Sequence, residues 1–272
     1  GNHHTATDNI MKMTGAELVI RLLERQGIRL IAGIPGGANL PLYDALARRP
    51  VIQHILARHE QGAGFIAQGM ARTTGQTAVC FATSGPGATN IITAIADAKL
   101  DSIPVVCISG QVPQHLIGTD AFQEVDVFGM SLSITKHNYL VKSVEALLET
   151  IPEAFRIAAS GRPGPVWIDI PKDVQNAQIE FDEWPEVGSA TPRIEPKSPA
   201  IEQAQAMIEA AERPILYLGG GVIHSEACEQ VCALAERSNL PTVNTLMAMG
   251  ALPTDHRLSL GMLGMHAAPY TN

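Results

Sequence analysis

The sequence has few aromatic residues, no cluster of basic residues and no long hydrophobic run. Aromatic residues make up 4% of the 272 residues, and the formal net charge is −8 at pH 7. Proteins that bind nucleic acid or anionic membranes usually present a basic patch, and those that stack bases need aromatic rings. No apolar run approaches the ~18 to 20 residues of a membrane span. The composition therefore argues against both partners and favours a small-molecule or cofactor enzyme.

Cysteine is also scarce, with four residues in the chain. Cys80 and Cys107 lie in strand-like apolar runs, which is typical of core thiols. Cys228 and Cys232 are four residues apart on one predicted helix, without partnering Cys or His pairs at metal spacing. The sequence therefore predicts a cytoplasmic protein with no metal site in this chain.

Strand-like and helix-like segments alternate along the chain. Apolar runs predict strands at residues 28–34, 51–56, 77–82, 103–108 and 166–170. This alternation is typical of a doubly wound parallel α/β sheet, which binds ligands at the carboxyl ends of its strands. We expect a tail or expression remnant at 1–12, a first domain at 13–185, a proline-rich linker at 186–199 and part of a second, Rossmann-like α/β domain at 200–272.

The stretch R-H-E-Q-G-A-G-F-I-A-Q-G-M-A-R, residues 58–72, follows a predicted strand and has helical periodicity. Glu60 therefore lies at a strand-to-helix junction, where the helix dipole stabilises a carboxylate. A plain acidic residue in a first helical turn is the simplest interpretation. Gly62, Gly64 and Gly69, however, each cost the helix about 1 kcal/mol relative to Ala. Their presence predicts that another part of the molecule approaches this backbone closely.

Two motifs identify a family resemblance: H-E-Q-G-A-G-F-I-A-Q-G-M-A-R from residue 59 and T-S-G-P-G-A-T-N from residue 83. They resemble the pyrimidine-binding domain of thiamine-diphosphate enzymes, and most of all the catalytic large subunit of acetohydroxyacid (acetolactate) synthase. The resemblance implies that Glu60 bonds to the ring nitrogen N1′ of the cofactor, so that the cofactor's own amine can remove the C2 proton. A buried apolar site would raise the pKa of this carboxyl above ~4.3 and suit reversible proton sharing.

Two loops add candidate site residues. The turn P-G-G-A-N at 35–39 can be an ordinary strand-to-helix turn. The resemblance places Gly36, Gly37 and Ala38 beside the thiamine ring, with Gly37 among the catalytic residues. In the long segment around G-T-D-A-F-Q-E at 118–124, sequence alone favours Phe122 as a core anchor, although long loops are often functional. The resemblance implies instead that Phe122 contacts substrate and that Gln123 is a catalytic hydrogen-bonding group.

The remaining candidates flank one strand or lie in the second domain. Arg162 and Lys172 read as solvated cations, whereas the resemblance makes Arg162 a flavin contact and Lys172 a residue at the substrate entrance. A triple glycine after a strand attracts anions, but it is not the G-x-G-x-x-G of hydride-transfer enzymes. The resemblance implies that FAD is lined by Gly219, Gly220, Gly221, Thr245, Leu246, Met247, Gly261, Met262, Leu263, Gly264, Met265 and His266.

The implied parent reaction decarboxylates pyruvate on thiamine diphosphate and adds the hydroxyethyl carbanion to pyruvate or 2-oxobutyrate, in branched-chain amino acid biosynthesis. FAD would be bound without net redox. The family's G-D-G motif and following Asn, which bind Mg²⁺ and the diphosphate, are absent from these 272 residues. We therefore expect the metal ligands to lie outside this chain, and the chain alone to be inactive. The resemblance also implies a homodimer or higher homo-oligomer and allows a small regulatory subunit.

Two alternatives stay open at this point. The chain can belong to another thiamine-diphosphate enzyme, such as pyruvate oxidase, oxalyl-CoA decarboxylase or glyoxylate carboligase. Glu60 argues against the last of these, which typically lacks the glutamate. The second alternative is a non-catalytic truncated module that assembles with full-length subunits.

Overall fold

The computed structural model describes residues 9–272 and divides the chain into two compact units, Gly1–Arg193 and Ile194–Asn272. Each unit is described by itself below, as unit 1 and unit 2. In the described part of the chain, no helix has the length and apolar character needed to cross a membrane.

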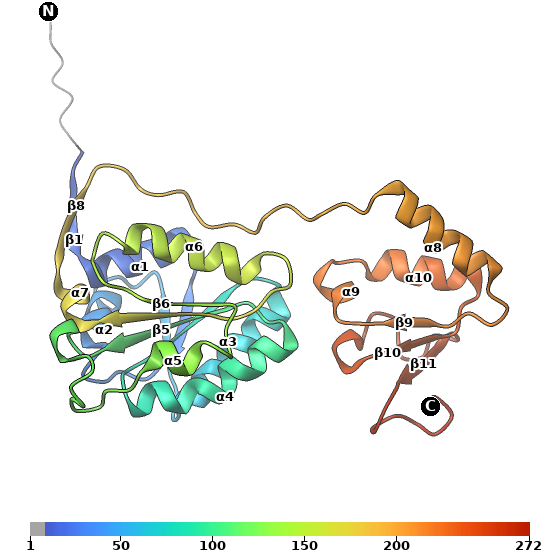
Figure 1. The fold of residues 1–272 in the computed structure, drawn as a ribbon, viewed down its shortest axis with the longest axis horizontal. Helices are drawn as coiled ribbons and strands as arrows, with labels where there is room; N and C mark the ends of the chain where they lie inside the picture. Colours follow the sequence, from blue (N-terminus) through green and yellow to red (C-terminus); the bar gives the residue numbers. More distant parts are fainter. Residues whose placement is uncertain (1–8) are drawn as a thin grey trace, which may run out of the picture. The chain divides into compact units, whose positions relative to one another are not determined.

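Unit 1 is built on a six-stranded, fully parallel sheet with strand order β3-β2-β4-β5-β7-β6. Helices cover both of its faces (Figure 1). One face carries α1 (Gly15–Arg25), α2 (Leu40–Ala47) and α6 (Leu147–Ala159), and the other carries α3 (Glu60–Thr74) and α4 (Pro86–Asp101). This confirms the predicted α/β fold with a parallel sheet. The strands are β2 (Leu30–Gly33), β3 (Gln53–Leu56), β4 (Ala78–Ala82), β5 (Val105–Gln111), β6 (His137–Leu140) and β7 (Val166–Pro171).

The strand order reverses direction between β2 and β4. From β2 the chain passes through α2 (Leu40–Ala47) to β3 at one edge of the sheet, whereas from β4 it passes through α4 (Pro86–Asp101) to β5 on the other side. The loops that leave β2 and β4 therefore lie at a topological switch point of the sheet, at the carboxyl ends of these strands. Ligands of open α/β sheets bind at such a switch point.

Apolar burial holds the helices on this sheet. All seven residues of β5 are buried, and α1 (Gly15–Arg25) buries seven residues against α2, α6 (Leu147–Ala159) and the sheet. Thr14 and Glu17 form the expected capping box, in which Glu17 N donates to Thr14 Oγ1 and Thr14 N donates to Glu17 Oε2. This cap satisfies free backbone donors at the start of α1.

Helix α3 (Glu60–Thr74) packs closely against α4, and one of its three glycines permits this. A Cβ added at Gly64 would lie 2.5 Å from Ala94 Cβ, whereas a Cβ at Gly62 or Gly69 would meet nothing within 4 Å. The predicted close approach to the α3 backbone is thus present at Gly64 within this chain.

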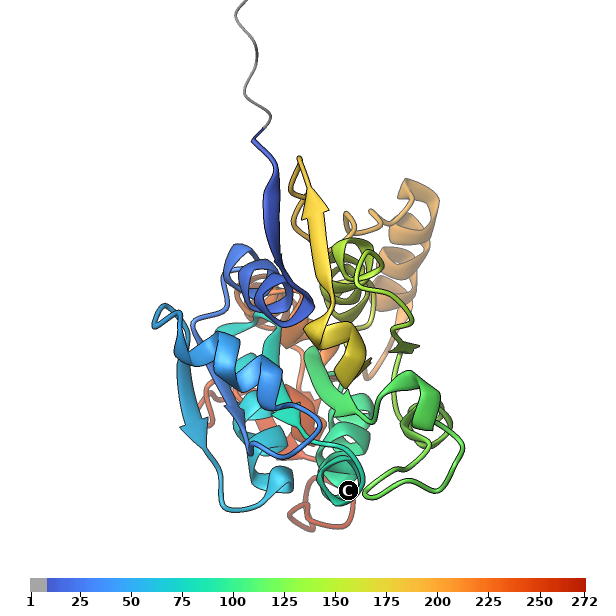
Figure 2. The same cartoon turned by 90° about the vertical axis from the view of Figure 1, so that its left-hand side faces the viewer.

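The amino-terminal boundary differs from the expectation. Met11 and Lys12 belong to β1 (Met11–Thr14), which pairs antiparallel with β8 (Gln178–Phe181), as Figure 2 shows. The tail interpretation is therefore wrong for these two residues, because a partner strand far along the chain orders them. Residues 1–8 lie outside the described part of the chain.

One strand and two short helices of unit 1 were not predicted from the sequence. Helix α6 runs through Pro152 without interruption. Residues 137–140 form β6 at the edge of the sheet, and two short helices, α5 (Val127–Ser131) and α7 (Lys172–Asn176), flank the 112–126 loop and β7. Part of the linker is held on unit 1, since Gln26 Nε2 donates to Gly188 O at 2.9 Å and Gly188 N donates to Gln26 Oε1 at 2.6 Å.

Unit 2 contains a three-stranded parallel sheet of order β11-β10-β9. Its small core includes Leu218, Ala235 and Leu258. Helix α8 (Ser198–Ala210) begins inside the predicted linker and has no buried residue. The other elements are β9 (Leu216–Leu218), α9 (Gly221–His224), α10 (Cys228–Ser238), β10 (Thr242–Asn244) and β11 (Ser259–Met262).

Candidate active site

Glu60 is the first residue of α3, directly after the loop that follows β3. His59 caps the helix, because its Nδ1 accepts a hydrogen bond from Gln61 N at 3.0 Å. The Glu60 side chain is half-buried, and its Oε2 accepts a hydrogen bond from Asn90 Nδ2 of α4 at 3.0 Å. The close contact between α3 and α4 therefore fixes the direction of the carboxylate.

The second oxygen of this carboxylate faces a bare stretch of backbone. A Cβ added at Gly87, in the first turn of α4, would lie 3.6 Å from Glu60 Oε1. Among residues 9–272, Asn90 is the only hydrogen-bond donor recorded for Glu60. One oxygen is thus held in place while the other is available to share a proton with a ligand nitrogen.

The two loops of the switch point touch each other through glycine. A Cβ added at Gly36 would lie 2.5 Å from Thr83 Cγ2, and Ala38 N donates to Thr83 Oγ1 at 3.3 Å. Gly37 lies between them, exposed and with open space around its backbone. The close contact with Thr83 requires a glycine at position 36. At Gly37 the peptide is accessible to a ligand.

Tyr43 and His54 form a neutral pair near Glu60. Burial raises the pKa of Tyr43 well above its ordinary value, and the nearby Cys80 and Glu60 raise it further. Burial lowers the pKa of His54, whose Nε2 lies 3.0 Å from Tyr43 Oη. At neutral pH neither side chain adds a charge beside Glu60.

The 112–126 loop carries the next two candidates. Phe122 is 87% exposed, so the interpretation as a core anchor is wrong. Gln123 is also exposed and has a positive φ of 54°. Its backbone lies against Gly85, where an added Cβ would come within 2.7 Å of Gln123 O. The loop backbone therefore reaches the start of α4, with the Phe122 side chain projecting into solvent.

Lys172 and Arg162 lie at opposite ends of β7. Lys172 lines a cavity of about 370 Å³ together with Leu40 and Pro41 of α2 and the ion pair of Asp44 and Arg48. No hydrogen bond or ion pair is recorded for Lys172 within residues 9–272. The carboxylates of Glu17 and Asp44 line the same cavity, so Lys172 lies among charges of both signs at the carboxyl edge of the sheet.

Arg162 is at the opposite, amino-terminal edge. It donates through Nε to Ser102 Oγ at 2.6 Å and through Nη2 to Leu100 O at 3.2 Å, at the end of α4. The structure therefore does not bring Arg162 together with Glu60.

Sequence reasoning missed a buried polar group in β7. Asp169 is 1% exposed, its Oδ1 accepts from Ser109 Oγ at 2.6 Å, and its Oδ2 accepts from Gln111 Nε2 at 2.9 Å. Burial raises the pKa of Asp169 to about 7, although both hydrogen bonds oppose this. A single Asp inside the apolar run V-W-I-D-I was the available signal, because a buried carboxyl requires hydrogen-bonding partners.

In unit 2, the three predicted cofactor segments follow the three strands. Residues 219–221 follow β9, residues 245–247 follow β10 and residues 263–266 follow β11, so all three meet at the carboxyl edge of the parallel sheet. A Cβ added at Gly220 would lie 3.0 Å from Met247 Cβ. Met265 and His266 are exposed. The segments after β9 and β10 thus approach each other closely at Gly220.

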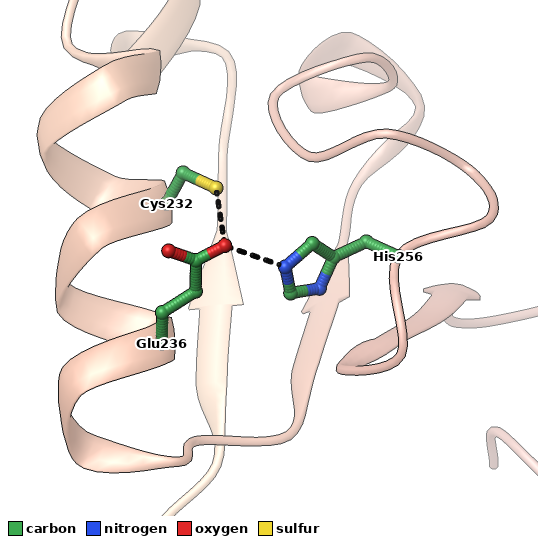
Figure 3. A group of neighbouring side chains, drawn as sticks. All are labelled: Cys232, Glu236 and His256. Atoms are coloured by element: carbon green, nitrogen blue, oxygen red, sulfur yellow. Dashed lines mark hydrogen bonds and ion pairs between the residues drawn. The ribbon is translucent and has the colours of Figure 1, made fainter.

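Unit 2 also brings Cys232, Glu236 and His256 together (Figure 3). Their hydrogen bonds account for this arrangement without a metal. His256 Nδ1 accepts from Leu258 N at 3.1 Å, which leaves the imidazole proton on Nε2, 3.0 Å from Glu236 Oε1. Cys232 Sγ donates to the same oxygen at 3.8 Å. Because Nε2 carries the proton, it has no lone pair for a cation.

Comparisons with known proteins point to the same chemistry. Residues 13–130 match the family model "Thiamine pyrophosphate enzyme, N-terminal TPP binding domain", and residues 201–272 match "Thiamine pyrophosphate enzyme, central domain". Thiamine pyrophosphate is another name for thiamine diphosphate. Both matches confirm the likeness inferred from the two motifs around Glu60 and Thr83.

Three relatives illustrate the similarity. The Escherichia coli (strain K12) protein "Acetolactate synthase isozyme 1 large subunit" is 61% identical over 268 residues, 98% of this chain and 47% of that protein. The Corynebacterium glutamicum "Acetolactate synthase large subunit" is 50% identical over 258 residues, 94% of this chain and 41% of its own. The Methanocaldococcus jannaschii "Probable acetolactate synthase large subunit" is 49% identical over 265 residues, 96% of this chain and 45% of that protein. The chain spans about half the length of these relatives.

Proposed function

This chain belongs to the thiamine pyrophosphate enzyme family, and on that premise we propose that it forms the amino-terminal part of an acetolactate synthase. The proposed reaction decarboxylates pyruvate and joins the two-carbon product to a second 2-oxoacid, either pyruvate or 2-oxobutyrate. The observation that carries the proposal is Glu60, held by Asn90 with one oxygen free beside the glycine loops of the switch point. The 61% identity to a large subunit of that name supports this choice of reaction.

The residues around Glu60 fit the aminopyrimidine ring of thiamine diphosphate. When bound, this cofactor supplies the carbon nucleophile that attacks the 2-oxoacid. Glu60 Oε1 would share a proton with the ring nitrogen, and Asn90 holds Oε2 so that Oε1 keeps its direction. The exposed peptide at Gly37 and the contact of Gly36 with Thr83 would border the ring. General acid–base assistance of this kind typically contributes 10²–10⁴-fold to a rate.

The experiment uses a complete subunit that contains this sequence. Pyruvate consumption and acetolactate formation are measured with and without thiamine diphosphate, for the parent and for Glu60→Gln. We expect Glu60→Gln to lower the rate about 10²–10⁴-fold, and the matched control Glu145→Gln, at an exposed position, to retain the parent rate. An undiminished rate in Glu60→Gln would refute the proposed role. Catalytic reduction of bound flavin by pyruvate would identify a pyruvate oxidase instead.

FAD and Mg²⁺ belong to the same proposal. The glycine-rich carboxyl edge of unit 2 supports FAD, since bare backbone N–H groups beside a helix start bind anionic groups. Gly220, Met247 and His266 lie on the three segments involved. We propose that Arg162 also contacts the flavin and that Mg²⁺ is bound by residues outside this chain. Flavin absorbance of the purified complete subunit tests the site, and His266→Ala and Gly220→Val are expected to reduce it.

Phe122 and Lys172 are the proposed substrate contacts. The Lys172 side chain makes no ion pair within residues 9–272 and shares a cavity with Leu40 and Pro41, which suits the carboxylate and short carbon chain of a 2-oxoacid. We also propose a homodimer, supported by the exposed apolar side chains of Ile55, Leu56 and Phe65 near the Glu60 end of unit 1. A regulatory small subunit and a cytoplasmic location remain predictions. Sedimentation of the complete subunit tests the dimer.

A further inference from the structure

Gln111, the last residue of β5, connects the buried core to the loop that carries Phe122 and Gln123. Its side chain is 3% exposed. Its Nε2 donates one hydrogen bond to Asp169 Oδ2 at 2.9 Å and another to Val125 O at 3.1 Å. Both protons of the amide are therefore used, one toward the core and one toward the loop.

The surroundings allow a single orientation of this amide. Gln111 Oε1 accepts a hydrogen bond from Val112 N at 2.8 Å. A backbone N–H only donates, so Val112 requires the Oε1 side of the amide and leaves Nε2 toward Asp169. Asp169 is itself fixed by Ser109 Oγ, which accepts from Trp167 Nε1 at 2.8 Å. The core therefore aims the second Nε2 proton at the loop.

The bond to Val125 controls the neighbouring part of the loop. Gln123 is two residues away and holds its backbone against Gly85 with a positive φ of 54°. The beginning of the loop is held separately, because Gln114 N and Nε2 both donate to the Asp173 carboxylate at 3.0 Å. Gln111 is thus the anchor at the Gln123 end of the loop.

We propose that Gln111 is a positioning residue for the 112–126 loop, and that Asp169 orients the Gln111 amide for this task. The inference deepens the proposed function and rests on it, because it assigns Gln123 and Phe122 to the reaction. Neither Gln111 nor Asp169 touches the substrate in this account. They act by holding the loop where Gln123 reaches the start of α4.

The test separates loop positioning from general stability in the 272-residue chain. Gln111→Glu removes the hydrogen bond to Val125 O and places a second carboxylate against that of Asp169 in the core. Asp169→Asn keeps both Gln111 bonds, because the Asn Oδ1 can still accept from Gln111 Nε2. The double variant Gln111→Glu/Asp169→Asn restores a buried pair, in which the Asn amide donates to the new carboxylate. It cannot restore the bond to Val125, because an ionised Glu has no donor.

Two measurements are made on each variant: hydrogen exchange of amides at 112–127 and the urea midpoint of unfolding. We expect loop exchange to be about tenfold faster in both variants that carry Gln111→Glu, the factor for one net hydrogen bond. Exchange in Asp169→Asn should equal that of the parent. The urea midpoint should fall in Gln111→Glu and recover in the double variant. If Gln111→Glu does not fold, the double variant alone carries the exchange test.

The opposite pattern would overturn the proposal. In that pattern, the double variant recovers both its urea midpoint and the slow loop exchange of the parent. This result would mean that Gln111 only stabilises the core. The matched control is Gln26→Glu, which alters a Gln that also bonds backbone, at Gly188. Exchange at 112–127 should not change in this control. If the exchange rate at 112–127 rises in Gln26→Glu as much as in Gln111→Glu, the proposal is also refuted.

A kinetic measurement on a complete subunit then distinguishes this inference from the proposed function. We expect the double variant to raise KM for the 2-oxoacid or lower kcat about tenfold, while thiamine diphosphate still binds. Unchanged kinetics together with faster loop exchange would overturn the catalytic part of the inference and leave the assignment of Glu60 intact. The activity of Glu60→Gln tests the proposed function separately, because this variant leaves Gln111 unchanged.

Discussion

The packing of α3 on α4 makes Gly64 the most sensitive glycine of α3. An added Cβ would lie 2.5 Å from Ala94 Cβ and 3.1 Å from Ile91 Cγ1, where ordinary contact begins near 3.4 Å. In Gly64→Ala the two helices must therefore move apart. The same movement would pull Asn90 of α4 away from Glu60 of α3.

The expected cost follows from a comparison with Gly62→Ala. Both substitutions gain about 1 kcal/mol of helix propensity, and at Gly62 the new methyl meets nothing within 4 Å. Overpacking in a close contact typically costs about 1–3 kcal/mol. Gly62→Ala should therefore stabilise unit 1, and Gly64→Ala should be about 1–3 kcal/mol less stable than Gly62→Ala. Removing the opposing methyl in Gly64→Ala/Ala94→Gly should recover most of this difference.

Urea unfolding followed by tryptophan fluorescence measures these free energies. Both tryptophans, Trp167 and Trp184, lie in unit 1, so the signal reports this unit alone. A double-mutant cycle over Gly64 and Ala94 gives their coupling energy. If Gly64→Ala proves as stable as Gly62→Ala, or if Ala94→Gly gives no recovery, the close helix contact and the argument that it fixes Glu60 are wrong.

Three other residues at the sheet edge provide further tests. Phe122→Ala should leave the urea midpoint unchanged, because the ring is 87% exposed, but raise KM for the 2-oxoacid in a complete subunit; a lower midpoint would indicate a core role. Gly110→Ala would place a Cβ 2.2 Å from Ala38 O and should weaken thiamine diphosphate binding more than about tenfold, measured by calorimetry; unchanged affinity would contradict this. Asp169 has a pKa raised to about 7 by burial, against ~3.9 unfolded. The folded state therefore binds the extra proton between these values, and stability should fall as pH rises through this window, by at most about 1.4 kcal/mol per unit. Asp169→Asn should lack this slope when urea midpoints are compared at about pH 5 and 7.5, and identical slopes would refute the assignment.

Local sequence predicted the central elements of unit 1 because each has its own signal. The strands β2, β4, β5 and β7 are apolar runs, and Thr14 with Glu17 marks the start of α1. The elements that were missed depend on distant partners. The edge strand β6 reads H-N-Y-L, without an apolar run, and exists because β7 pairs with it. Likewise β1 is ordered by its pairing with β8, far along the chain.

The candidate site divides in the same way. The residue types at Glu60, Gly36 and Gly37 carry a motif that sequence alone can identify. The partner of Glu60 is different, because Asn90 reaches it only when α3 and α4 are packed together. The exposure of Phe122 and the buried amide of Gln111 likewise depend on how the 112–126 loop lies on the strand ends.

The sequence by itself determined the parallel α/β class, the likeness to thiamine pyrophosphate enzymes and the position of the carboxylate that we propose for the active site, because periodicity and motif spacing are local properties of the chain. The tertiary structure decided which side chain holds that carboxylate, which glycine is needed for packing and which buried amide anchors the loop. These contacts join residues 14 to 58 positions apart. No local pattern encodes them, since they form only after the strands have taken their order in the sheet.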